Sequence, residues 1–196
     1  GGVTVATPDE TVDKIIRDRC SLCRFGDGEF RLMQEAGDLD FQKMEPVLLQ
    51  RLKEVWDSDD ENIMIATNWH FFNSLIDVKN SQWVKNYLPS NRQYLDSITR
   101  PGKQYYATEI SCMYMVYKNM DYDAHYAKLR KIWDNRDVVL VQGQGIRDKH
   151  VYNIFDNVKS LEYVFAPSKD AFSEYNDILK QVKQHDKDKL ILIILG

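Results

Sequence analysis

The chain has 196 residues, of which 43% are hydrophobic and 29% are charged, and its formal net charge is −4. This length and composition are typical of a soluble globular protein and predict a single domain over residues 1–196. The acidic balance argues against nucleic acid as the main partner. No apolar run approaches the ~18 residues that a membrane span requires.

The number of cysteines indicates the redox environment of the protein. Cys20, Cys23 and Cys112 are too few for a disulfide framework, so we expect a cytoplasmic location. Cys20 and Cys23 have the spacing of a redox pair or of half a zinc site, but no second cysteine pair completes such a site. We therefore interpret these residues as buried thiols.

The first elements follow from local signals. Thr7-Pro8-Asp9-Glu10 has the form of a capping box with proline at the first helical position, which predicts a helix through Ile16. Apolar spacing then predicts a strand over residues 21–25 and helices over residues 29–36 and 44–56.

Later elements alternate between strands and helices. We expect strands over residues 62–67, 103–108, 138–141, 161–165 and 189–195, and helices over residues 74–99, 122–133 and 173–184, with a helical turn at 151–155. The strands are almost continuously Val, Ile and Leu, which favours an α/β fold with a mainly parallel sheet and helices on both faces. Residues 190–195 are apolar on both faces, so we expect this strand inside the sheet.

The most informative motif is Arg24-Phe-Gly-Asp-Gly-Glu29, directly after the first strand. Asp27 and Glu29 are separated by one glycine, a pattern suited to one Mg²⁺ or Mn²⁺ with positions left for substrate phosphates. Gly26 and Gly28 would let the backbone approach a ligand and take φ values closed to other residues. The two acids could instead only cap the next helix, and the spacing leaves both readings open.

Other polar residues follow the later strands, where open α/β sheets bind ligands. Gly143 and Gly145 come after the strand at 138–141 and could cradle a phosphate or form a plain turn, while Arg147 adds a planar donor. Pro167 and Ser168 come after the strand at 161–165, and Ser168 could face a nucleotide or cap a helix.

Asn68, His70 and Glu109 follow two further strands, and we expect all these clusters to converge at one edge of the sheet. We interpret His125 and His185 as surface residues, and His150 as a residue that could approach a phosphate.

The aromatic pairs have two possible roles. Tyr105, Tyr106, Met113 and Met115 read as core residues, whereas Tyr114 could serve in the core or as a sugar platform.

With these motifs in view, the sequence resembles the GT-D-type bacterial glycosyltransferases over most of its length. The resemblance rests on residues 24–29, 110–115, 133–147, 166–172 and 189–196. Members of that family move a sugar from a UDP-sugar to a growing glycan on a Rossmann-like sheet, with Asp-x-Glu holding a divalent cation. The resemblance therefore implies a hexosyltransferase with a UDP-sugar donor and a glycan acceptor, and makes Asp27 and Glu29 ligands of Mn²⁺ or Mg²⁺. Together with the positions above, we expect substrate contacts from Arg24, Gly26, Gly28, Asn68, Gly143, Arg147, Pro167 and Ser168.

The chain departs from the family pattern in ways that bear on substrate identity. Gln142, Gln144 and residues 148–151 replace an acidic, glycine-rich run, and Cys112 replaces an expected arginine. The family continues past the position of Gly196 with a unit thought to contribute metal binding and the catalytic base. We therefore expect a C-terminally incomplete domain, a base beyond Gly196 with Glu109 as the candidate within the chain, and a homo-oligomer or glycosyltransferase partner over exposed apolar surface.

Two alternatives to a metal-dependent glycosyltransferase stay open. A Mg²⁺-dependent phosphohydrolase or nucleotidyltransferase also uses paired acids near a sheet edge, but it normally needs a third carboxylate, for which Glu109 and Asp170 are the candidates. A non-catalytic module that binds a nucleotide sugar is the second alternative.

Overall fold

The computed structural model describes residues 2–72, 78–79, 92–144 and 154–195. The chain divides into two compact units, which we describe separately. The first consists of Gly1–Ala36 with Pro46–Leu129, and the second of Gly37–Glu45 with Arg130–Gly196. The expectation of a single domain stays a prediction.

The first unit contains a parallel four-stranded sheet in the order β1-β4-β3-β2. Its strands are short and are joined by helical connections, as parallel pairing requires. They are β1 (Thr4–Val5), β2 (Ser21–Arg24), β3 (Ile63–Thr67) and β4 (Gln104–Ala107).

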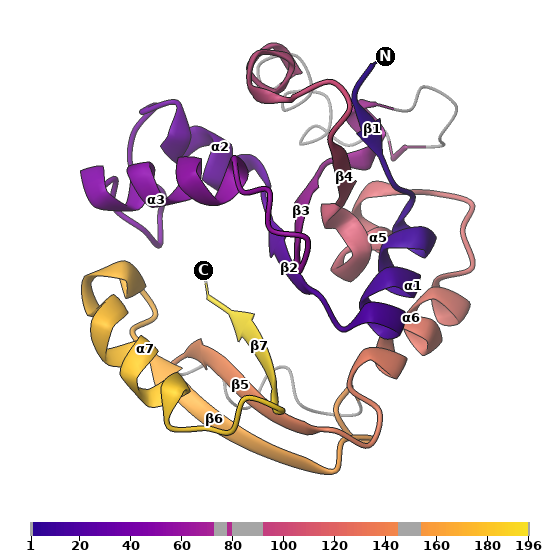
Figure 1. Cartoon of the computed structure of the whole chain (residues 1–196), viewed down its shortest axis with the longest axis vertical. Coiled ribbons are helices and arrows are strands. Elements are labelled where there is room, and N and C mark those ends of the chain that lie inside the picture. The colour runs from indigo at the N-terminus through magenta and orange to yellow at the C-terminus, as the bar shows by residue number, and fades with distance from the viewer. Residues whose placement is uncertain (1, 73–77, 80–91, 145–153, 196) are drawn as a thin grey trace. The chain divides into compact units, whose positions relative to one another are not determined.

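The helices of the first unit lie on both sides of this sheet (Figure 1). They are α1 (Pro8–Asp18), α2 (Asp27–Met33), α3 (Pro46–Trp56), a helix over residues 92–98, α5 (Met113–Val116) and α6 (Tyr122–Leu129). Two 3₁₀ turns come after β3 and β4: η1 (Trp69–Phe71) follows β3 after one residue, and η2 (Thr108–Ser111) follows β4 directly. The predicted cap of α1 is confirmed, because the Glu10 N–H donates to Thr7 Oγ1 at 3.1 Å.

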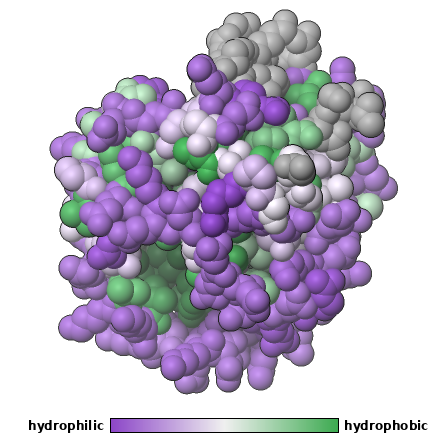
Figure 2. Space-filling model, turned by 45° about the horizontal axis from the view of Figure 1, so that its top comes forward, coloured by the Kyte–Doolittle hydropathy of each residue, from purple (hydrophilic) through white to green (hydrophobic). Residues whose placement is uncertain are grey.

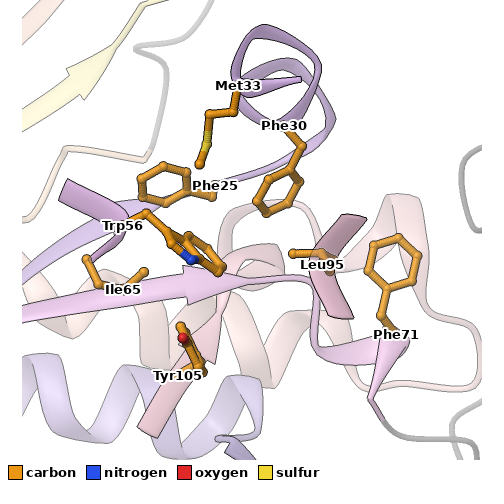
Figure 3. Packing of buried hydrophobic residues seen from close by; sticks show 8 residues of the cluster. All are labelled: Phe25, Phe30, Met33, Trp56, Ile65, Phe71, Leu95 and Tyr105. Atoms are coloured by element: carbon orange, nitrogen blue, oxygen red, sulfur yellow. The ribbon is translucent and has the colours of Figure 1, made fainter. Parts of the chain in front are cut away.

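An aromatic core joins the sheet of the first unit to α2 and α3 (Figure 3). Phe30 is fully buried and packs edge-on against Trp56, with ring centroids 5.6 Å apart. Trp56 stacks on Tyr105 of β4 at 5.2 Å and donates its indole N–H to the Ile98 carbonyl at 3.0 Å. Buried aromatic side chains of this size remove much apolar surface from water, so this cluster fixes α2 against the strands.

The second unit has a parallel three-stranded sheet in the order β6-β5-β7. The strands are β5 (Asp137–Gly143), β6 (Ser160–Ala166) and β7 (Leu190–Ile194). The helical segments are η3 (Arg130–Ile132), η4 (Ala171–Glu174) and α7 (Tyr175–Lys183). Ile178 and Val182 of α7 pack on Val139, Val141 and Val164 of the sheet.

The predicted α/β fold with parallel strands flanked by helices is confirmed, although the strands form two sheets where the sequence suggested one. The prediction that the last strand lies inside the sheet was wrong. Within the described residues β7 pairs only with β5, so it is an edge strand, and Ile193 is 66% exposed. An apolar run identifies a strand, but it carries no information about the order of strands in a sheet.

Two expectations about burial were also wrong. His125 is buried, since its Nε2 makes a 2.6 Å hydrogen bond with the Ile110 carbonyl. Tyr105 and Met113 are core residues as expected, Tyr106 is half-buried, and Met115 is half exposed. The cause is the helical period: Met113 and Val116 form the buried face of α5, and Met115 lies on the opposite face.

The three cysteines are free and half-buried. Burial raises the pKa of the Cys23 and Cys112 thiols, which disfavours the thiolate that redox or zinc chemistry needs. In the part of the chain that the structure describes, no helix is long and apolar enough to cross a membrane.

The aromatic core yields a stability prediction. Phe30→Ala should lower the free energy of unfolding by about 3–5 kcal/mol, because it leaves a cavity between α2, α3 and the sheet. Val47→Ala, at a position that is 55% exposed on α3, is the matched control and should change it by less than about 0.5 kcal/mol. Urea unfolding followed by circular dichroism measures both. Equal losses in the two variants would contradict the assigned core.

Candidate active site

The turn after β2 is anchored by an apolar side chain between charged ones. Phe25 is 2% exposed and meets Trp56 edge-on, with ring centroids 5.1 Å apart. Arg24 and Asp27 on either side are exposed. The buried ring therefore fixes the backbone of the turn while the charged groups face solvent.

The two acids of the motif have different surroundings. Glu29 folds back so that its Oε2 accepts the Gly26 N–H at 2.8 Å, which caps the first turn of α2. Its Oε1 and the Asp27 carboxylate make no hydrogen bond or ion pair with the described residues. Capping thus accounts for one of the four carboxylate oxygens, and three remain at the start of α2.

The expected role of the two glycines in backbone conformation was wrong. Gly26 has φ −125° and ψ −162°, an extended conformation open to any residue, and Gly28 lies inside α2 without a positive φ. A Cβ built on Gly26 would meet Glu29 Oε2 at 3.5 Å, an ordinary contact. Of the two reasons for glycine that the sequence suggested at positions 26 and 28, only the close approach of a ligand to the backbone remains.

The donor set fits a particular kind of metal binding. Within the described ranges, no group of three or more His, Cys, Asp or Glu side chains gathers around a common point. Mg²⁺ is usually bound through one or two carboxylates together with waters and substrate phosphates, rather than in a cage of protein ligands. Asp27 and Glu29 match that type, so a cation here would share its ligands with a phosphate-bearing substrate.

Arg24 connects two strand ends. It is the last residue of β2, and its Nε donates to the Thr108 carbonyl, directly after β4, at 2.9 Å. Strand β3 lies between β2 and β4 in the sheet, so this bond spans the carboxyl edge of three strands. The guanidinium is thereby held near the Asp27 turn, at the edge where α/β sheets bind ligands.

A buried hydrogen-bonded pair of side chains lies at the same edge, after β3 and β4. His70 Nδ1 and Glu109 Oε1 are 2.7 Å apart, and both side chains are 1% exposed. The other oxygen of Glu109 accepts the Trp69 N–H at 3.2 Å. Burial and, second, the charge of Glu109 raise the pKa of Tyr117 next to this pair. Because both oxygens of Glu109 accept hydrogen bonds inside the protein, the geometry favours a positioning role over proton abstraction from an acceptor.

Asn68 lies between β3 and η1 and is buried. It belongs to the same edge as Arg24, His70 and Glu109, so the predicted gathering of these residues at the strand ends of the first unit is observed. Their role in substrate binding stays a prediction.

The predicted residues of the second unit also lie at strand ends. Gly143 ends β5, and the next N–H, of Gln144, donates to the Ala166 carbonyl at 2.9 Å. Ser168 Oγ donates to the Gln144 carbonyl at 2.5 Å, so the loops after β5 and β6, including Pro167, are joined. Ser168 does not cap η4, whose N-cap residue is Asp170.

Asp170 is hydrogen-bonded to the segment Gly37–Glu45 of the same unit. Its Oδ1 accepts the Lys43 N–H at 2.8 Å, and its own N–H donates to the Phe41 carbonyl at 2.8 Å. Arg147, Gly145 and His150 lie outside the described residues. The expected convergence of the clusters of both units at one edge therefore stays a prediction.

Two residues that form contacts at this edge of the first unit, Thr108 and Tyr126, were not predicted from the sequence. The Thr108 carbonyl binds Arg24, and the Tyr126 hydroxyl donates to the Ser111 carbonyl at 3.3 Å. The first contact uses a backbone atom and the second joins residues 15 positions apart. Neither leaves a local pattern in the sequence that could have revealed it.

The buried pair yields a second prediction. Glu109→Gln should lower the free energy of unfolding by about 1.5–3 kcal/mol. The amide of Gln has one acceptor oxygen and no charge, so it cannot replace both carboxylate oxygens in the contacts with the His70 ring and the Trp69 N–H. Asp27→Asn, a matched loss of charge on the exposed turn, should change it by less than about 0.5 kcal/mol. Chemical unfolding of both variants provides the measurement. If Glu109→Gln is as stable as the parent chain, the positioning role is wrong.

Comparisons with known proteins agree with this architecture. The family model described as the glycosyltransferase GT-D fold matches residues 22–196. The chain is 30% identical to the probable glycosyl transferase Gly of Streptococcus gordonii, over 99% of this chain and 29% of that protein. It is 25% identical to the glycosyltransferase GlyD of Streptococcus pneumoniae serotype 4, over 96% of this chain and 23% of the relative. The chain thus spans less than a third of the length of these two relatives.

Solved structures show the same similarity. A structure described as a new glycosyltransferase from Streptococcus sanguinis, of domain of unknown function 1792, superposes with a TM-score of 0.89 at 26% identity, covering 100% of this chain and 74% of that one. A second structure of this domain, described as having a distinct glycosyltransferase fold, gives a TM-score of 0.86 at 26% identity, over 99% and 70% of the two chains. The sequence, the parallel α/β architecture and these matches together show that the chain belongs to the family of the glycosyltransferase GT-D fold.

Proposed function

We propose that this chain is a metal-dependent glycosyltransferase domain that moves a hexose from a UDP-sugar donor to a glycan acceptor. The observation that carries the proposal is the pair of carboxylates at the end of β2, with Asp27 exposed and Glu29 Oε1 directed to no described partner. The description of both streptococcal relatives as glycosyl transferases supports it. A homo-oligomer or glycosyltransferase partner and a cytoplasmic location stay predictions.

The chemistry of transfer explains why these residues suit the task. The acceptor hydroxyl oxygen bonds to the anomeric carbon of the sugar while the bond from that carbon to the diphosphate oxygen breaks. The electron pair leaves on the diphosphate and the hydroxyl proton passes to a base. A divalent cation, Mn²⁺ or Mg²⁺, supplies the positive charge that stabilises the leaving diphosphate.

Each residue of the edge then has a role in the proposal. Asp27 and Glu29 Oε1 would hold the cation, and the Arg24 guanidinium, fixed by its bond to Thr108, would add a second positive charge toward the diphosphate. Glu109 and His70 join the segments that follow β3 and β4. We assign the base to none of the described residues.

The proposal predicts metal-dependent nucleotide binding. Asp27→Asn and Glu29→Gln should each weaken UDP affinity in the presence of Mn²⁺ by at least about ten-fold, since each removes one charged ligand. The Glu29→Gln variant keeps an oxygen that can cap Gly26, so its effect reports on charge rather than on folding. Isothermal titration calorimetry with Mn²⁺ and again with EDTA measures the difference.

Glu10→Gln is the matched control, because Glu10 is also an exposed acid in the first turn of a helix. It should bind UDP as the parent chain does. UDP affinity that is the same with Mn²⁺ and with EDTA, or unchanged in both Asp27→Asn and Glu29→Gln, would contradict the proposal. Turnover of p-nitrophenyl phosphate would instead support a phosphohydrolase, although both candidates for its third carboxylate, Glu109 and Asp170, are engaged in internal hydrogen bonds.

A further inference from the structure

A small aromatic surface of the first unit lies outside the residues assigned above to the candidate active site. Tyr114 and Met115 of α5 are 52% and 51% exposed, and Tyr126 of α6 is half-buried beside them. We call Tyr114, Met115 and Tyr126 the aromatic platform. Figure 2 shows a face of the protein on which hydrophilic residues predominate. Tyr114 and Met115 are adjacent in sequence and each is half open to water, so together they offer a ligand an exposed aromatic and apolar surface.

The platform is held in place by polar contacts beneath it. The rings of Tyr114 and Tyr126 are 6.3 Å apart at an angle of 46°. The Tyr126 hydroxyl donates to the Ser111 carbonyl, and the neighbouring His125 binds the Ile110 carbonyl, so α6 is fixed to η2. A ligand would meet a surface that is already ordered and would lose little free energy in ordering it.

A lysine fixes the other side of the platform. Lys79 donates its Nζ to the Tyr114 carbonyl and its N–H to the Val116 carbonyl at 2.8 Å. Its ammonium lies 5.8 Å from the centre of the Tyr122 ring. The short helix α5 is thus held from outside, while the Tyr114 ring stays exposed.

The platform belongs to the same sheet edge as the candidate active site. Residues 108–116 run from the end of β4 through η2 into α5 without a break. The first of them, Thr108, binds Arg24, which is three residues before Asp27. Four residues lie between Thr108, whose carbonyl binds Arg24, and the buried Met113. Tyr114 comes directly after Met113, so the platform is close in sequence to the contact that holds Arg24.

We propose that the aromatic platform is a subsite for a pyranose ring of the acceptor glycan, an inference that rests on the proposed function. A pyranose with equatorial hydroxyls presents a face of C–H groups and a rim of hydroxyls. The exposed ring of Tyr114 matches the C–H face, because an aromatic face is apolar and electron-rich. Like any tyrosine, Tyr126 is protonated at neutral pH and adds no negative charge beside a neutral sugar, and burial raises its pKa further, to about 12.

The platform differs from a donor subsite in its chemistry. A nucleotide diphosphate needs cationic groups or a metal, and these lie at Arg24 and at the Asp27 turn. The ammonium of Lys79 is engaged by the Tyr114 carbonyl and the Tyr122 ring. A neutral sugar needs no such charge, so the two ends of the edge suit the two substrates of a transferase.

The test measures sugar binding separately from nucleotide binding. Saturation-transfer NMR on the chain uses four probes: the methyl β-glycosides of glucose, galactose and N-acetylglucosamine, and cellobiose. At least one should bind the parent chain, and Tyr114→Ala should weaken that binding by at least about five-fold, while Tyr114→Phe should retain it. Tyr175→Ala is the matched control, since Tyr175 is a 36% exposed tyrosine beside Phe172 in the second unit, and it should bind as the parent chain does.

UDP affinity with Mn²⁺, measured by calorimetry on the same variants, should be unchanged in Tyr114→Ala. No binding of any of the four probes, or equal binding by Tyr114→Ala and the parent chain, would overturn the subsite. A loss of UDP affinity in Tyr114→Ala would also overturn it, because it would assign the platform to the donor. Failure of metal-dependent UDP binding in the parent chain, with sugar binding intact, would count against the proposed function and leave the platform supported.

Discussion

The insertion of Phe25 into the aromatic core is the contact on which the candidate site depends. This residue follows β2 directly and packs against Trp56 and Phe30, between an exposed arginine and an exposed aspartate. The burial of one ring fixes the path of the backbone at the point where the sheet ends and α2 begins. Charged groups on such a turn keep their position without burying their charge, which would cost much more than the ring contributes.

Polar groups at the same edge divide into an outer and an inner set. The outer set is Arg24, Asp27 and Glu29, whose charged groups face solvent. Only two of its side-chain polar atoms, Arg24 Nε and Glu29 Oε2, form hydrogen bonds with described residues. The inner pair, His70 and Glu109, is almost fully buried, and its side chains form a hydrogen bond within the protein. A binding site is preorganised when buried polar contacts fix the backbone that carries its solvent-facing charged groups.

Much of this could be predicted from sequence because the deciding signals are local. The cap at Thr7, the strand before Arg24 and the Asp-x-Glu turn are each set by neighbouring residues and lie where expected. Other features depend on contacts between distant segments. The place of β7 at a sheet edge is set by which strands pair, and His125 is buried because Ile110 comes to it from another element. No periodicity within one segment contains that information.

The same distinction applies to the site. The residue types of the motif indicated a divalent cation, whereas only the folded chain reveals that Glu29 shares its carboxylate between a helix cap and an open position. The central claim is that Asp27 and Glu29 hold a cation together with a nucleotide diphosphate. Anomalous diffraction from crystals grown with UDP and Mn²⁺ tests it most directly. We expect one manganese peak within bonding distance of the Asp27 carboxylate, Glu29 Oε1 and a UDP phosphate oxygen. UDP bound without manganese at this turn, or manganese bound elsewhere, would contradict it.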